Sequence, residues 1–206
     1  MQNFVYLIGC ARTREALVVD PAWEVDTLLR AAEEADLRLT TAAVTHRHGD
    51  HVNGLPDLLE RASVRVYAHE DDADELPLPA SEVTRASGGE KIRVGDLEVE
   101  LVHTPGHTAG SQCLLVRGTL VTGDTLFVNG CGRCDLPGGD AARMHDTLTR
   151  VLGALPAETR VLPGHNYDPA ATSTLGEERR HNPFFQLADR SAFVEFRTMR
   201  SRRKAP

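Results

Sequence analysis

Short apolar runs alternate along the chain with longer stretches in which apolar residues recur at helical spacing. Residues 4–8 and 16–20 are apolar runs around a polar turn, which predicts a β-hairpin. Between Trp23 and Leu37, apolar residues recur every three or four positions, which predicts an amphipathic helix. We expect a strand at 41–45 and a helix from Leu55 to Arg61. The first third of the chain therefore mixes strands and helices.

The rest of the chain continues this mixture. Residues 70–87 are acidic and contain prolines, so we expect an excursion over the surface there. Residues 140–155 carry a helical period, and one or two helices are expected from Ser173 onward. Further strands are predicted at 64–68, 91–94, 97–102, 112–116, 119–122 and 159–162. This order predicts an α/β fold with sheets covered by helices.

Length and composition describe an ordinary globular protein. The chain has 206 residues, 41% hydrophobic and 26% charged, which suits one domain with a sizeable core. The net charge of −7 argues against a general nucleic-acid binder. No apolar run approaches membrane-spanning length, and the first residues lack the basic region of a secretory signal. We therefore expect a cytoplasmic protein without nucleic-acid or membrane partners; its oligomeric state stays open.

The segment from Thr45 to His51, Thr-His-Arg-His-Gly-Asp-His, concentrates metal-binding side chains. Neutral imidazoles and carboxylates are ligands for zinc, iron and manganese. Residues two apart in an extended loop point the same way, so His46 and His48 can share one cation. Gly49 is expected to make a turn after which Asp50 and His51 face a second cation.

Three more candidate ligands follow apolar strands in the same manner as His46. His107, Asp124 and His165 each come after a glycine that follows an apolar run. Loops at one edge of a rigid sheet can converge, so we expect these groups to meet. His46, His48 and His107 would hold one divalent ion, and Asp50, His51 and His165 a second. Asp124 would bridge the two ions, because a carboxylate has two oxygens; zinc is expected, with iron or manganese as alternatives.

The four cysteines are too few for a disulfide scaffold. Cys131 and Cys134 have the Cys-x-x-Cys spacing of redox or zinc-ribbon sites, but a second pair is missing from the sequence. We interpret them as thiols of a loop close to the metal site.

The motif His46-x-His48-x-Asp50-His51 with His107, Asp124 and His165 resembles the metallo-β-lactamase superfamily over nearly the whole chain. That resemblance implies an αββα sandwich with the metals at one edge. We expect a metallo-β-lactamase-like domain over residues 1–170 and a short helical extension over 171–206 packed on it.

Within the superfamily, two groups share further motifs with this chain. The segments 123–127 and 130–133 are similar to glyoxalase II, the hydroxyacylglutathione hydrolases. The segments 166–167, 173–174, 177–179 and 182–183 resemble persulfide dioxygenases, which use a single iron held by the equivalents of His46, His107 and Asp124. The predicted function is a glyoxalase II-like thioester hydrolase; the alternatives are a mono-iron persulfide dioxygenase and a lactonase or related hydrolase.

The predicted substrate is a small molecule, a thiol conjugate. Two close cations activate a bridging water as hydroxide, and Asp50 is expected to orient it as a catalytic residue. A thiolate can leave without a general acid because its conjugate acid has a pKa near ~8.5. Arg133 is expected to meet a substrate carboxylate, Tyr167 to contact the thiol moiety, and Arg179 to attract an acidic carrier such as glutathione or coenzyme A.

Overall fold

The first sheet has five strands in the order β1-β2-β3-β4-β5. The structure, a computed structural model, describes residues 3–202, with side chains up to residue 197. β1 and β2 form the predicted hairpin, and the pairs from β2 to β5 are parallel. The strands are β1 (Tyr6–Gly9), β2 (Glu15–Val19), β3 (Arg38–Ala43), β4 (Arg65–His69) and β5 (Val83–Ala86).

The second sheet has six strands in the order β13-β12-β9-β8-β7-β6. Neighbouring strands from β6 to β9 are antiparallel, whereas β9 and β12 are parallel. The strands are β6 (Lys91–Val94), β7 (Leu97–His103), β8 (Gln112–Val116), β9 (Thr119–Gly123), β12 (Arg160–Pro163) and β13 (Ser173–Thr174). A small hairpin, β10 (Leu126–Phe127) with β11 (Gly130–Cys131), lies beside this sheet.

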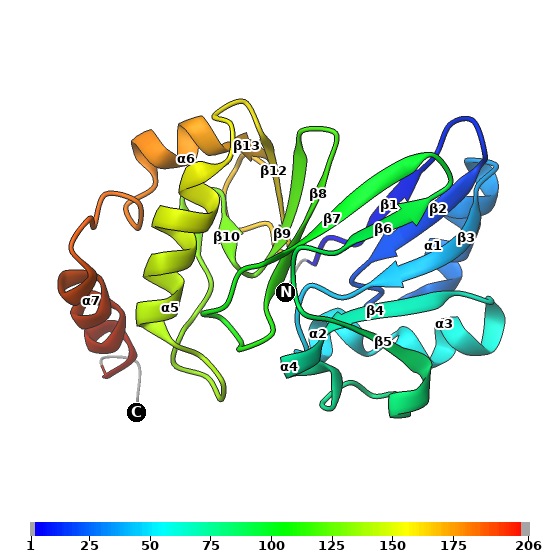
Figure 1. The fold of residues 1–206 in the computed structure, drawn as a ribbon, viewed down its shortest axis with the longest axis horizontal. Helices are drawn as coiled ribbons and strands as arrows, with labels where there is room; N and C mark the ends of the chain where they lie inside the picture. Colours follow the sequence, from blue (N-terminus) through cyan, green and yellow to red (C-terminus); the bar gives the residue numbers. More distant parts are fainter. Residues whose placement is uncertain (1–2, 203–206) are drawn as a thin grey trace.

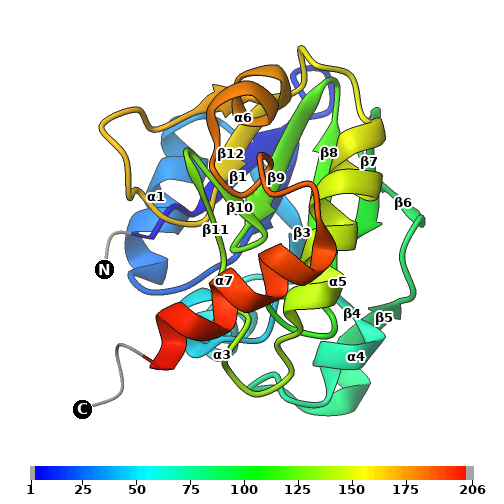
Figure 2. The same cartoon turned by 90° about the vertical axis from the view of Figure 1, so that its left-hand side faces the viewer.

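Helices cover the outer face of each sheet, which gives the αββα sandwich (Figure 1). The first sheet carries α1 (Val25–Glu34) and α3 (Leu55–Arg61), and the second carries α5 (Ala141–Asp146), η2 (Thr147–Leu152) and α6 (Leu175–His181). In Figure 2, α7 (Arg190–Arg202) lies in front of α5. The remaining helical segments are short: α2 (Gly49–Val52), α4 (Glu70–Ala73) and η1 (Ala80–Glu82).

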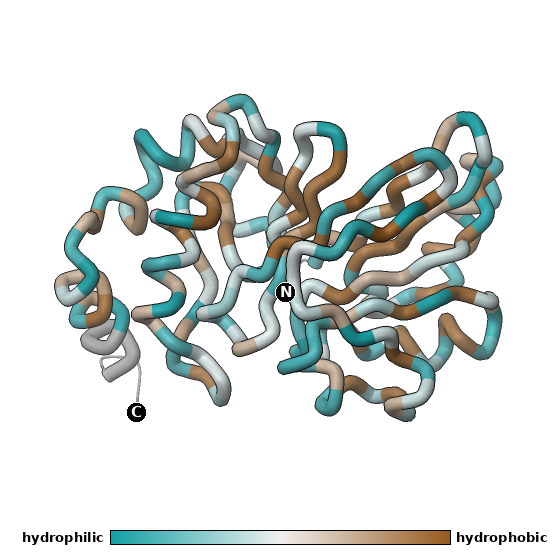
Figure 3. The backbone as a smooth tube through the Cα atoms, in the orientation of Figure 1, coloured by the Kyte–Doolittle hydropathy of each residue, from teal (hydrophilic) through white to brown (hydrophobic). Residues whose placement is uncertain are grey.

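The buried strands show why the chain needs two layers of helix. Successive side chains of a strand point to opposite faces. In β2, Ala16 and Val18 pack under the helices of the first sheet, whereas Leu17 and Val19 pack between the sheets. The apolar segments of Figure 3 follow these strands. The sheets therefore have two apolar faces each, and both faces must be covered.

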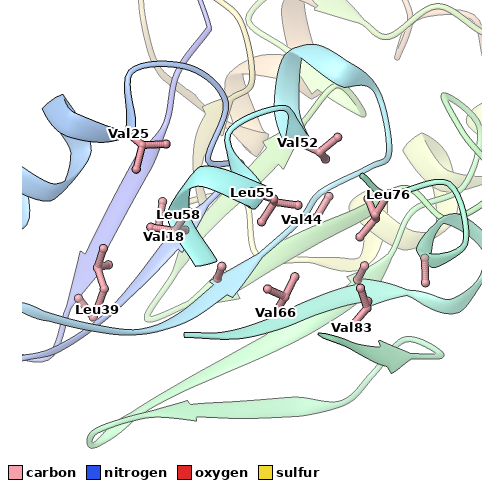
Figure 4. Packing of buried hydrophobic residues seen from close by; sticks show 14 of the residues in the cluster. Val18, Val25, Leu39, Val44, Val52, Leu55, Leu58, Val66, Leu76 and Val83 are labelled. Carbon is pink, nitrogen blue, oxygen red and sulfur yellow. The ribbon is translucent and has the colours of Figure 1, made fainter. Parts of the chain in front are cut away.

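Helix α3 illustrates how a helix covers the first sheet. Leu55 and Leu58 lie on one face of the helix and are fully buried. They pack in the cluster that contains Val18 and Val66 of the sheet (Figure 4). Burying a leucine side chain stabilises the fold by about 1.5–3 kcal/mol. Pro56, in the first turn, needs no helical hydrogen-bond partner there.

The C-terminal segment shares the core of the second sheet. Phe184 and Phe193 lie in one apolar cluster with Met144 and Leu148 of the covering helix. Thr174 caps α6 reciprocally with Glu177, so this helix begins where β13 ends. The side chains of the basic cluster at Arg200, Arg202, Arg203 and Lys204 lie outside the described residues. No helix among the described residues is both long and apolar enough to cross a bilayer.

The structure confirms three local expectations in outline and differs from them in detail. Gly49 makes the predicted turn, but it does so in ordinary helical backbone, as the first residue of α2. The segment 70–87 is not wholly irregular, because Val83 and Ala86 are buried and place β5 at the edge of the first sheet. The helix predicted over 140–155 changes at Thr147 from α to π winding, with Leu148 and Leu152 still buried.

Candidate metal centre

The seven predicted ligands converge at the edge where the two sheets meet. His46, His48, Asp50 and His51 follow β3 of the first sheet. His107, Asp124 and His165 follow β7, β9 and β12 of the second sheet. The geometry thus brings together every residue of the predicted ligand set.

His46, His48 and His107 form the first group, which we call site 1. One ligand atom from each lies within 4.8 Å of those of the other two. Nδ1 of His48 is 2.9 Å from Nε2 of His107. Three imidazoles at this spacing suit a tetrahedral zinc site with one open position.

Asp50, His51 and His165 form the second group, site 2, with ligand atoms again within 4.8 Å of one another. Nε2 of His51 lies 3.3 Å from Nε2 of His165, which lies 3.4 Å from Oδ2 of Asp50. The helical turn of α2 produces this arrangement, because it turns Asp50 and His51 away from the direction of His48.

Asp124 lies between the two groups. Its Oδ1 is 3.3 Å from Nε2 of His51 and 3.4 Å from Nε2 of His165, both in site 2. Its Oδ2 is 3.6 Å from Nε2 of His107 in site 1. Each carboxylate oxygen therefore faces a different group, which is the arrangement that a bridging ligand requires.

The hydrogen bonds on the outer side of the rings leave lone pairs facing inward. Nδ1 of His107 donates to the carbonyl of Arg133 at 2.7 Å, and Nδ1 of His51 donates to Asp20 at 2.9 Å. These outer hydrogen bonds orient both rings so that Nε2 of each faces the centre. Nε2 of His46 is buried and has no hydrogen-bond partner among the described residues. A buried polar atom without a partner is costly, so this donor set fits divalent cations.

Burial and neighbouring charges set the protonation states of several candidate ligands. Burial lowers the pKa of His46 and of His107, and burial together with His107 lowers the pKa of His48 to about 4. Although burial raises the pKa of Asp124, hydrogen bonds with His165 and His51 hold it well below its usual range. These groups are therefore neutral imidazoles and a carboxylate at neutral pH, the forms that bind metal.

Asp20 was missed by the sequence analysis, although it contacts both the metal loop and a ligand. It is buried, and its Oδ1 accepts from the backbone N–H of Thr45 at 2.7 Å. Its Oδ2 accepts from the Thr45 hydroxyl at 2.6 Å and from His51 at 2.9 Å. Burial alone would lower the pKa of His51, but Asp20 and then Asp124 raise it to about 10 in the metal-free protein. Asp20 thus orients His51.

Asn3 and Gly164 complete the surroundings of site 2. The Asn3 amide donates to the backbone carbonyl of Asp50 at 2.6 Å, which ties the chain start to α2. A Cβ at Gly164 would lie 2.8 Å from Oδ1 of Asp124 and 2.9 Å from Cε1 of His51. The glycine before His165 is therefore required by close approach to two ligands.

A pocket of about 720 Å³ opens over both groups of ligands. Its walls include Phe127 and Tyr167, and Tyr167 stacks on His165 with ring centroids 5.1 Å apart. Arg133 and Arg197 also line it. The guanidinium of Arg133 forms two 2.9 Å hydrogen bonds with Asp135.

Arg179 lies elsewhere and does not line this pocket. Its guanidinium donates to the backbone carbonyls of Leu152 and Leu155, so it closes the end of the helix that covers the second sheet. Of the three predicted substrate contacts, the structure thus places Arg133 and Tyr167 at the pocket.

His69 and His103 form a further pair of histidines near the metal centre. Their rings stack with centroids 3.8 Å apart, and with Asp71 they could offer three ligand atoms. However, Nδ1 of His69 already accepts from the backbone of Asp71, and Nε2 of His103 donates to Ala109. One nitrogen of each ring is therefore already engaged in a hydrogen bond.

Two cysteines lie near the same loop. Burial raises the pKa of Cys131 to about 12 and that of Cys134 to about 11. Both thiols are therefore protonated at neutral pH, which does not favour redox chemistry.

The fold and these candidate ligands are typical of the metallo-β-lactamase superfamily, and the family comparison agrees. The profile of the Metallo-beta-lactamase superfamily matches residues 1–165, and the chain belongs to that superfamily.

The chain is similar to three proteins in particular. It is 32% identical to "Probable polyketide biosynthesis zinc-dependent hydrolase PksB" of Bacillus subtilis, over 98% of this chain and 89% of the relative. It is 31% identical to the hydroxyacylglutathione hydrolase of Nitrosococcus oceani, over 95% of this chain and 86% of the relative. The crystal structure of ETHE1 from Myxococcus xanthus superimposes with a TM-score of 0.89 and 37% identity, over 100% of this chain and 88% of that one.

Proposed function

We propose that the protein is a metal-dependent hydrolase that cleaves a thioester of the hydroxyacylglutathione type, with two divalent ions, zinc expected, bound at sites 1 and 2. The observation that carries this proposal is the position of Asp124, whose two oxygens face different groups of ligands. The similarity to a hydroxyacylglutathione hydrolase and to a zinc-dependent hydrolase supports it. The cytoplasmic location and the lack of nucleic-acid or membrane partners stay predictions from the sequence.

Two ions held by the residues of sites 1 and 2 would supply a hydroxide nucleophile and would polarise the scissile carbonyl. The protein contributes the position of Asp50, which is partly exposed to the pocket and is held by the Asn3 amide. Its carboxylate can accept the proton of the attacking water and orient the nucleophile. The leaving thiolate needs no proton, because a thiol has a pKa near ~8.5.

The substrate would lie against the aromatic wall of the pocket. Tyr167 and Phe127 make an edge-to-face pair with centroids 5.0 Å apart and can pack on an acyl or thiol moiety. Arg133 and Arg197 are cations of the same pocket and can pair with a carboxylate of an anionic substrate. Arg197 is an additional candidate; its guanidinium donates to the carbonyl of Gly132 at 2.6 Å and lies over the ring of Phe184.

The test is the change His48→Ala in zinc-loaded protein assayed with S-lactoylglutathione. We expect hydrolysis to fall by at least ~10²-fold, because a ligand of site 1 is lost, while thermal unfolding of the metal-free protein changes little. The matched control is His181→Ala, an exposed histidine outside the pocket. If the wild type never hydrolyses thioesters, and iron-loaded protein consumes oxygen with a persulfide whether or not His48 is present, the hydrolase proposal is wrong.

A further inference from the structure

We infer that Asp72 and Arg47 are positioning residues for site 1: a buried ion pair that fixes the distance between the loop of His46 and His48 and the loop of His107. The inference rests on the proposed metal centre. Site 1 needs this ion pair because the three ligands of the site come from two loops on different sheets. A contact that spans both loops decides whether their imidazoles meet at one point.

Asp72 is at the centre of this contact. It lies in α4, its side chain is 1% exposed, and each of its carboxylate oxygens accepts one hydrogen bond from each loop. Oδ2 accepts from the backbone N–H of Arg47 at 3.1 Å and from the hydroxyl of Thr108 at 2.6 Å. Oδ1 accepts from the Arg47 guanidinium at 3.1 Å and from the backbone N–H of Gly110 at 3.1 Å.

The donors to Asp72 are close neighbours of the ligands in the chain. Arg47 stands between His46 and His48, and Thr108 follows His107. A shift of either donor therefore moves an imidazole of site 1. Gly110 allows the close approach, since a Cβ there would lie 2.7 Å from the backbone nitrogen of Asp72.

Arg47 is held too firmly to serve as a substrate contact. Its side chain is 9% exposed, and its guanidinium also donates to the carbonyl of Pro137 at 2.6 Å. It pairs with Glu75 at 3.0 Å, but that carboxylate is 62% exposed. Arg47 thus extends the contact from Asp72 to the loop of residues 136–139, which contributes Leu136 to the pocket wall.

Site 2 has a separate support. Asp20 holds His51, and Asn3 holds Asp50. The four hydrogen bonds that Asp72 accepts all come from the two loops of site 1. Asp20 also accepts from Thr45, beside His46, but the carboxylate of Asp72 bonds only to Arg47, Thr108 and Gly110, so loss of Asp72 should weaken the ion at site 1 more than the ion at site 2.

The experiment measures zinc affinity with a competing chelator in two single-site backgrounds. His165→Ala removes a ligand of site 2 and leaves site 1, whereas His48→Ala does the reverse. In Asp72→Asn an amide nitrogen replaces one oxygen, and that position can no longer accept from either loop. In the His165→Ala background, we expect Asp72→Asn to weaken zinc binding by ~10–100-fold. In the His48→Ala background, we expect Asp72→Asn to change the zinc affinity by less than ~2-fold.

Two further variants make the outcome decisive. Glu75→Gln removes only the exposed partner of Arg47 and should leave both affinities unchanged. Thr108→Val removes one of the two hydrogen bonds to Oδ2 of Asp72 and should also lower the zinc affinity of site 1. If Asp72→Asn does not fold, Thr108→Val serves as the test variant in its place. Equal losses at both sites, or no loss at site 1, would overturn the inference. A wild type that binds fewer than two ions would instead overturn the proposed metal centre.

Discussion

The change Asp20→Asn tests how strongly the structure controls a ligand through its neighbour. Asparagine has the shape of aspartate and tolerates left-handed backbone, which matters because Asp20 has φ 52°. The backbone N–H of Thr45 requires an oxygen at the Oδ1 position. The amide nitrogen of the introduced asparagine would then take the place of Oδ2 and face Nδ1 of His51.

The consequence is a change of tautomer at His51. An amide N–H donates to Nδ1, so the ring proton moves to Nε2, the atom that points into site 2. In the wild type, an ion that displaces the Nε2 proton leaves an Nδ1–H that donates to Asp20, whereas in the variant that Nδ1–H would face the amide N–H. A loss of ~10–100-fold in affinity is typical of such outer contacts, which corresponds to about 1.4–2.7 kcal/mol. Folding should also lose about 1.5–3 kcal/mol, the value of one hydrogen bond to a charged group.

The assay combines zinc competition with urea unfolding of the metal-free protein. The affinity of the second ion should fall more than that of the first, and the free energy of unfolding should drop by about 1.5–3 kcal/mol. If asparagine at this position leaves both ions bound as in the wild type, then Asp20 does not set the tautomer of His51.

Three further outcomes are expected. In the metal-free protein the neighbouring carboxylates raise the pKa of His51 to about 10, so an ion at site 2 must displace a proton; the measured affinity of the second ion should therefore rise between pH ~6 and ~8, and a flat profile would contradict this. Gly123→Ala should lower the free energy of unfolding by at least about 1–3 kcal/mol, since Gly123 has φ 48° and a Cβ would lie 2.3 Å from Oγ1 of Thr45; unchanged urea unfolding would show that the loop adjusts. Arg179→Met should lower the melting temperature without changing KM, and a raised KM would restore the predicted substrate contact.

The ligand set could be predicted because four candidate ligands lie within residues 46–51 and the others repeat one local sequence pattern. His46, His107, Asp124 and His165 each follow an apolar run, and strands that end at one sheet edge bring such residues together. The same rule would have found Asp20, which follows Leu17-Val18-Val19 directly. It was overlooked because Asp20-Pro21 is also a typical end of a strand.

Other features depend on packing that is not visible in the local sequence. The sequence of β5 contains polar residues and follows a segment with two prolines, so it does not predict a strand by itself. Its pairing with β4 in the first sheet makes it one. Arg179 has the charge of a substrate contact, but its guanidinium donates to the backbone carbonyls of Leu152 and Leu155 at a helix end. The contact between Asp72 and Thr108 joins residues 36 positions apart, and neither residue type indicates it alone.

The distribution of ligands over both sheets has a mechanical consequence. His51 and His165 are separated by 114 positions, so an ion held by both closes a long loop as a disulfide would. In a chain-entropy estimate, a cross-link around a loop of about 100 residues is worth about 4.7 kcal/mol. Zinc would thus act as a reversible cross-link between the two sheets. After cleavage of the chain in the exposed turn between β5 and β6, the two fragments should stay associated until a chelator removes the zinc.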